Sequence, residues 1–133
     1  MVIITKELKM KRIHVLLFVL VVTGLVRGDA SVTREQDPLT VNPKTISLKL
    51  ENSRVRVLEG VLKPNDVEKP HSHPPSVVYV IAGGKIRNHA EDGTVTEADL
   101  KNGDVIYREA IKQHWAENIG PTIIRLEVIE LKD

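Results

Sequence analysis

The sequence predicts an all-β fold in a single domain. Short apolar runs alternate with turn signals at nearly regular spacing, and no stretch keeps a sustained helical period. A chain of 133 residues has room for one domain with a modest core. About eight short strands of this kind suit a sandwich or a double-sheet jelly roll.

In the first half of the β domain, strands are expected at residues 45–50, 55–61 and 77–82. The first two alternate apolar and polar residues, as strands with one buried face do. The turn that follows them contains Asn65, which tolerates a left-handed backbone. The third strand is apolar on both faces, which indicates a central strand covered by two layers, and Gly83-Gly84 ends it.

In the second half, strands are expected at residues 85–90, 94–100, 105–109, 114–118 and 122–131. The first two flank Glu91-Asp92-Gly93, a hairpin signal in which glycine supplies the positive φ. The last two are separated by Ile119-Gly120-Pro121. The whole segment 45–133 is therefore predicted to form the β-barrel domain.

Residues 1–30 are interpreted as an N-terminal extension and a signal peptide. Lys11-Arg12 forms a positive region, residues 15–26 are mostly apolar, and Gly28-Asp29-Ala30 offers small residues for cleavage near Ala30. A membrane anchor is the weaker alternative, because a spanning helix needs roughly 20 apolar residues. We therefore expect export to the periplasm or the exterior, with no stable membrane span after cleavage. Met10 resembles a natural start, which would make residues 1–9 an upstream extension.

Residues 31–44 are polar, aperiodic and interrupted by Pro38 and Pro43, so an irregular N-terminal arm is predicted. Residues 1–30 hold five of the 19 basic and two of the 18 acidic residues, which leaves 14 basic and 16 acidic residues in the rest. Without clustered basic charge, nucleic-acid binding is not expected. The absence of cysteine excludes disulfides and a lipoprotein attachment site.

Three histidines are the strongest functional signal. His71 and His73 form a His-x-His pair whose rings face the same side of an extended strand, about 6 to 7 Å apart. His114 must reach them through the fold. One such histidine is more often a satisfied core residue. Three in this pattern favour binding of one divalent transition metal ion, with Fe, Mn, Ni, Cu and Zn all open.

Two segments carry a family resemblance. Residues 65–84 resemble the first cupin motif, a glycine followed after five residues by His-x-His, then a glutamate and a second glycine. Residues 103–118 resemble the second cupin motif, with its glycine, histidine and asparagine. The positions that match are Asn65, His71, His73, Gly84, Gly103, His114 and Asn118. The resemblance implies a small cupin-type jelly-roll β-barrel, also called a double-stranded β-helix, and implies metal ligation by the motif histidines.

The sequence also departs from the cupin motifs. In the register that preserves Gly84, the glutamate position holds Val77, which cannot bind a metal. Glu109 and Ile111 replace the proline and glycine of the second motif, and Asn65 replaces the first glycine. Three neutral imidazoles leave the charge of the ion uncompensated. The chain is thus expected to be a three-histidine variant that lacks the motif glutamate, a ligand set that occurs in thiol dioxygenases of the superfamily.

Two further residues are candidates for a substrate pocket. Tyr79 shares parity with Val77, so its ring is expected to face the interior with the ligands; a register shift by one residue would turn it outside. Glu109 is expected near the mouth of the barrel, where it would supply the missing carboxylate if the chain folds back at Ala110. The alternative for Glu109 is an exposed charge.

The predicted function is that of an exported cupin-domain protein that binds one metal ion and acts on a small organic molecule, in a dioxygenase-like or isomerase-like reaction. Three ligands with vacant coordination positions are typical of catalytic metal sites. The alternative is a non-catalytic module that binds a small ligand or a metal, and a purely structural barrel is a third. Pairing through an open sheet edge also predicts a homodimer.

Overall fold

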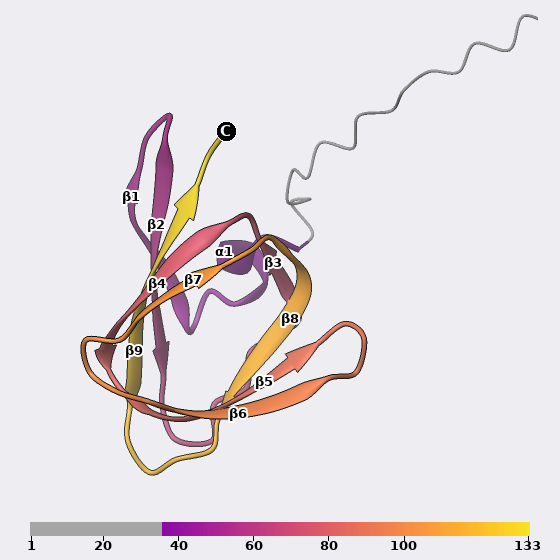
Figure 1. Ribbon diagram of the computed structural model, residues 1–133, viewed down its shortest axis with the longest axis vertical. Coiled ribbons are helices and arrows are strands. Elements are labelled where there is room, and N and C mark those ends of the chain that lie inside the picture. The colour runs from indigo at the N-terminus through magenta and orange to yellow at the C-terminus, as the bar shows by residue number, and fades with distance from the viewer. Residues whose placement is uncertain (1–35) are drawn as a thin grey trace, which may run out of the picture.

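The computed structural model describes residues 36–133, which form two facing β-sheets (Figure 1). The predicted signal peptide, its cleavage near Ala30 and the first part of the arm lie outside the described residues. No helix within residues 36–133 is long and apolar enough to cross a membrane.

The described part of the chain is almost entirely β-structure, as predicted. Its elements in chain order are α1 (Pro38–Val41), β1 (Ile46–Glu51), β2 (Val55–Leu62), β3 (His71–His73), β4 (Ser76–Ala82), β5 (Gly84–Ala90), β6 (Val95–Leu100), β7 (Val105–Arg108), β8 (Ile111–Asn118) and β9 (Ile124–Leu131).

The strands are arranged as a jelly roll. One sheet has the order β1-β2-β9-β4-β7 and the other has the order β3-β8-β5-β6. Every pair of neighbouring strands is antiparallel. Because the chain passes from one sheet to the other several times, segments that are distant in sequence meet across the barrel (Figure 1). This topology confirms the predicted all-β barrel.

The core lies between the sheets and is built by alternation along each strand. Side chains from both sheets form one buried apolar cluster. Its members are Leu62, Val80, Ile86, Leu100, Ala116 and Ile124. Three of its members, Leu62, Ile86 and Ala116, also line the cavity described below.

Strand β4 is covered on one face only, which corrects the expectation of a strand buried on both faces. Ser76, Val78 and Val80 are buried, whereas Tyr79 is 42% exposed on the opposite face. Val77 shares that outer face and is half-buried. The reason is that the jelly roll has only two layers, so that β4 turns one face to the exterior.

The segment predicted to be an irregular arm contains one helical turn, α1. Asp37 caps it by accepting a hydrogen bond from the Leu39 amide at 2.9 Å, and Pro38 occupies the first turn, where it loses no intrahelical bond. The turn packs against the barrel with Pro38 and Asn42 buried. Sequence reasoning missed this turn because four residues are too short to show a helical period.

The predicted turn residues behave as expected. Asn65 has φ 69° and Gly93 has φ 85°, both in the left-handed region. Asn118, the asparagine of the second motif, is fully buried and ties the end of β2 to the loop before β9 by donating to the Leu62 and Thr122 carbonyls. Its role is therefore structural, and it does not belong to the site described next.

Candidate metal centre

The fold gathers the three predicted histidines at one point. His71 lies directly opposite His114 in the pairing of β3 with β8, which is the closest approach that two strands offer. The ring centroids lie 4.8 Å apart for His71 and His73, 4.6 Å for His71 and His114, and 5.2 Å for His73 and His114. Candidate ligand atoms from all three lie within 4.8 Å of one another.

His73 is oriented by a chain of charged groups. Its Nδ1 lies 2.6 Å from Oε1 of Glu130, a carboxylate that is only 1% exposed. The other oxygen of Glu130 accepts from Arg56, and Arg56 also donates to Asp37 beside α1. A carboxylate at Nδ1 keeps the proton on that nitrogen. The Nε2 of His73 is therefore the nitrogen left to bind a metal.

His71 is oriented by neutral groups instead. Its Nδ1 lies 2.8 Å from the Lys69 carbonyl and 3.0 Å from the side-chain amide nitrogen of Asn42. The carbonyl is the nearer partner and can only accept, so we assign the proton to this nitrogen. The Asn42 side chain holds the backbone of Lys69 from both sides, accepting from its amide at 2.7 Å and donating to its carbonyl at 3.0 Å. The Nε2 of His71 is thereby left unprotonated and available.

His114 has no comparable support. Its Nε2 is buried and has no hydrogen-bond partner among the described residues. A buried nitrogen without a partner is costly, which makes it a group that a bound ion would satisfy. Burial, together with the neighbouring His71 and His73, lowers the pKa of His114 to about 2. Burial lowers the pKa of His71 to about 4.

These observations fit a metal ion. Only neutral imidazoles bind metals, and the lowered pKa values of His71 and His114 keep both rings neutral well below pH 7. In His71 and His73 one ring nitrogen is held by an outer partner, as is usual for metal-binding histidines. The residues that could hold an ion are thus His71, His73 and His114.

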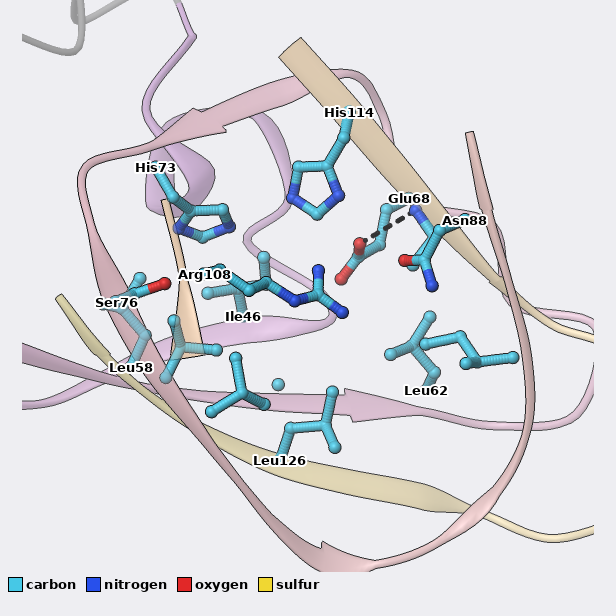
Figure 2. A pocket seen from close by; sticks show the side chains of 15 residues that line it. Ile46, Leu58, Leu62, Glu68, His73, Ser76, Asn88, Arg108, His114 and Leu126 are labelled. Carbon is cyan, nitrogen blue, oxygen red and sulfur yellow. Dashed lines mark hydrogen bonds between the residues drawn. The ribbon is translucent and has the colours of Figure 1, made fainter. Parts of the chain in front are cut away.

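A cavity adjoins the histidines (Figure 2). Its volume is about 50 Å³, several times the roughly 10–15 Å³ that one water molecule needs. Aliphatic side chains form most of its wall, and polar groups gather on one side. The polar residues that line it are Glu68, His73, Ser76, Asn88, Arg108 and His114.

Glu68 is a site residue that the sequence analysis missed. It lies in the loop between β2 and β3, where its backbone amide donates to the Ala116 carbonyl at 2.9 Å. Its carboxylate accepts from the Ala116 amide at 3.2 Å and lies 3.9 Å from Nε2 of His71. Burial raises the pKa of Glu68 to about 7, although the Ala116 hydrogen bond and the nearby Arg108 lower it. Its only sequence signal is an acid three residues before the His-x-His pair.

Arg108 is the second residue that the sequence analysis missed. It ends β7, pairs with Ser76 of β4, and turns its side chain to the same inner face. Burial lowers the pKa of its guanidinium, and the nearby Glu68 carboxylate opposes that shift. No pattern in the sequence distinguishes Arg108 from a solvated arginine.

Tyr79 and Glu109 do not join this site. Tyr79 lies on the outer face of β4, and Glu109 is exposed after the end of β7, where its carboxylate lies 3.4 Å from the Tyr107 hydroxyl. Neither lines the cavity. In β4 the position that faces the cavity is Val78, not Val77. Pro74 and Pro75 cause the difference, because they interrupt the strand between His73 and Ser76 and break the parity.

Comparisons with known proteins are informative at the level of structure alone. No protein-family model and no curated protein sequence matches the chain. A cupin domain from Bordetella pertussis matches with a TM-score of 0.62 and 24% identity, over 66% of this chain and 92% of that one. A cupin family protein with a double-stranded β-helix fold from Methanocaldococcus jannaschii matches with a TM-score of 0.54 and 18% identity, over 67% and 82%.

A third similar structure has the highest identity of the three. It is an uncharacterized conserved protein with a double-stranded β-helix domain from Klebsiella pneumoniae, with a TM-score of 0.52 and 27% identity, over 65% of this chain and 82% of that one. Together with the two-sheet topology, these matches show that residues 36–133 have the cupin fold that the motifs predicted.

Proposed function

We propose that this protein binds one divalent transition metal ion through His71, His73 and His114 and transforms a small organic molecule in the adjoining cavity. The observation that carries the proposal is the convergence of three buried imidazoles, of which those of His73 and His114 line that cavity. A dioxygenase-like or isomerase-like reaction is the class that such a site favours. Three protein ligands leave coordination positions open, which is typical of catalytic rather than structural metal sites.

The protein groups have separable tasks in this proposal. A divalent ion bound here would supply Lewis acidity and, with iron, manganese or copper, redox chemistry. Glu130 and the Lys69 carbonyl hold the rings of His73 and His71 in one tautomer. The aliphatic wall of the cavity, which includes Leu58 and Leu126, excludes water from the reacting molecule.

Glu68 favours an enzyme over a passive binding module. Its carboxyl group lines the cavity beside His71 and is positioned to take a proton from a bound molecule or to return one. A pKa of about 7 means that both protonation states are populated near neutral pH, which suits a general acid or base. A module that only stores a ligand has no need of such a group.

The non-catalytic module remains the second candidate. It is favoured by the small volume of the cavity and by Val78, an apolar residue at the inward position of β4 where a carboxylate would complete a four-ligand site. The two candidates differ in one measurable property, which is turnover by the metal-loaded protein.

Elemental analysis of protein purified without chelator tests the metal, and oxygen consumption or product formation with small thiols and small hydroxylated acids tests turnover. We expect one ion per chain in the wild type and loss of both metal and turnover in His73→Ala. Glu68→Gln should keep the metal and lose turnover, while Glu109→Gln, which removes an exposed carboxylate, should keep both. A metal-free wild type whose melting temperature ignores divalent ions would refute the proposal, and retained turnover in Glu68→Gln would refute the role of Glu68.

We also propose that the protein acts outside the cytoplasm. The support is the order of a positive region, an apolar stretch and small residues up to Ala30. N-terminal sequencing of protein recovered from the exported fraction should begin close to Ser31. Recovery of the full-length chain from the cytoplasm alone would contradict export.

A further inference from the structure

Arg108 projects into the cavity beside the histidines. Figure 2 shows its guanidinium in the middle of the cavity, close to His114 on one side and to Glu68 and Asn88 on another. The apolar stem of this side chain thus lies along the wall of the cavity, and its donor groups lie where a ligand would bind. Arginine presents these donors as a planar fork that matches a carboxylate or a phosphate.

The guanidinium is not satisfied by the part of the chain that the structure describes. Arg108 makes no side-chain hydrogen bond there, and Glu68 acts on it only as a nearby charge, with no ion pair between them within 4.0 Å. Arg56, the other arginine directed into the barrel, contrasts with it, because two carboxylates accept from Arg56. A guanidinium taken out of water costs free energy until partners replace its hydration.

The charge of the cavity also favours an anion. Among the described residues, Glu68 is the one carboxylate that lines the cavity, and it already accepts from the Ala116 amide. Glu130 is adjacent, but both of its oxygens are occupied by His73 and Arg56. Three neutral imidazoles would leave the two positive charges of a divalent ion uncompensated, in addition to that of Arg108.

We infer that the ligand of this cavity is a small organic carboxylate whose carboxylate group is bound by Arg108. The cavity of about 50 Å³ has room for about four water-sized groups, which limits the ligand to a few non-hydrogen atoms. Ser76 and Asn88 offer hydrogen bonds to a hydroxyl or a second oxygen, and the aliphatic wall accepts a short carbon chain. This inference rests on the proposed function for the placement of the ligand beside a metal ion.

Calorimetric titration with acetate, lactate and malonate, and with their uncharged amides, tests the inference in both metal-loaded and metal-free protein. We expect at least one carboxylate to bind the wild type, and its amide to bind much more weakly. Arg108→Gln should weaken carboxylate binding about ten- to a hundredfold, the loss expected for hydrogen bonds to a charged group. Arg108→Lys keeps the charge without the fork and should be intermediate. Arg125→Gln, which removes an exposed positive charge from β9, should bind as the wild type does.

Metal content and circular dichroism, measured for every variant, separate this inference from the proposed function. A folded Arg108→Gln protein that binds the carboxylate as tightly as the wild type would overturn the inference even if both hold their metal. Equal affinity for carboxylate and amide, or failure of every carboxylate to bind the wild type, would overturn it as well. A wild type without metal that still binds a carboxylate through Arg108 would support the inference while the proposed metal function fails.

Discussion

His73 and His114 face the same point in the barrel, yet the protein supports them in opposite ways. His73 is held by Glu130, which is held by Arg56, which is held by Asp37 at the cap of α1. His114 comes from the middle of β8 and leaves its buried Nε2 without a partner in the described structure. One ring is oriented by the protein before any ion arrives, and the other is satisfied only when an ion is present.

The difference between His73 and His114 means that one histidine supports the stability of the fold and the other mainly supports metal binding. The charged chain behind His73 joins the N-terminal turn, β2 and β9, so it stabilises the barrel with or without a ligand. His114 contributes binding capacity at a cost in stability, because a buried polar group without a partner loses its hydration. Variants of His73 and of His114 should therefore differ in their effect on the stability of the metal-free protein and have similar effects on metal affinity.

The largest effects are expected from His73→Ala and His114→Ala. Each removes a ligand, so metal affinity should fall by more than the roughly 100-fold that outer partners contribute. In the metal-free protein only His73→Ala deprives Glu130 of a hydrogen bond, and it should be less stable than His114→Ala by about 1–3 kcal/mol. Urea denaturation of both apoproteins measures this difference. Because both changes leave a similar cavity, equal stability would contradict the comparison.

Glu130→Gln should be the next in size. It keeps the shape of the side chain but leaves Arg56 without its most buried partner, and breaking a buried ion pair costs about 3–5 kcal/mol. Metal affinity should fall about 10- to 100-fold, because the orientation of His73 is lost. Denaturation and metal titration measure the two effects. Glu127→Gln, in the same strand but away from the cavity, is the matched control, and a loss of similar size there would contradict the assigned role of Glu130.

Asn42→Ala should have a smaller effect. Asn42 contacts His71 directly, with its amide nitrogen 3.0 Å from Nδ1, and it also holds the backbone of Lys69. Its removal therefore loosens the carbonyl that fixes the tautomer without removing that carbonyl. We expect a loss of about 1 kcal/mol in stability and about tenfold in metal affinity. The same denaturation and titration experiments apply. Unchanged metal affinity would show that the Lys69 carbonyl is held well enough by the rest of the chain.

A change in the pH dependence of the stability of the apoprotein is also expected. His71 and His114 have pKa values lowered from 6.5, to about 4 and about 2, so the unfolded chain takes up protons first and stability is lost as the pH falls below 6.5. Glu68 has a pKa raised from 4.5 to about 7, so the folded protein holds this proton more tightly than the unfolded chain does. Its contribution to stability is therefore lost as the pH rises from 4.5 to about 7.

Between pH 4.5 and 6.5 the two contributions oppose each other. Glu68→Gln removes the stabilising contribution of Glu68, which grows as the pH falls. The variant should therefore lose stability more steeply than the wild type on acidification. Thermal melts of metal-free protein at several pH values measure the slope. A shallower slope in Glu68→Gln would show that Glu68 is not the group that takes up the proton.

The local sequence pattern predicted the histidines of the site but not all of the residues around them. The spacing of His71 and His73 predicted their common direction, and the structure brings His114 to them as the second motif implied. The parity argument was wrong for Tyr79, because it took Val77 as the inward residue from the motif register, whereas Val78 faces the cavity. The sequence did not single out Arg108 for a different reason. Only the pairing of β7 with β4 decides whether Arg108 or its neighbour in the strand turns inward.

The sequence by itself determined the class of fold and the candidate ligands, because alternation, turn residues and the histidine spacing are local properties of the chain. Tertiary structure alone decided what surrounds those ligands. Glu68, Arg108 and Glu130 lie in a loop, at the end of one strand and near the end of another, and only the closure of the two sheets brings them to the histidines. The physical reason is that burial and charge pairing depend on distances between segments, which no local pattern encodes.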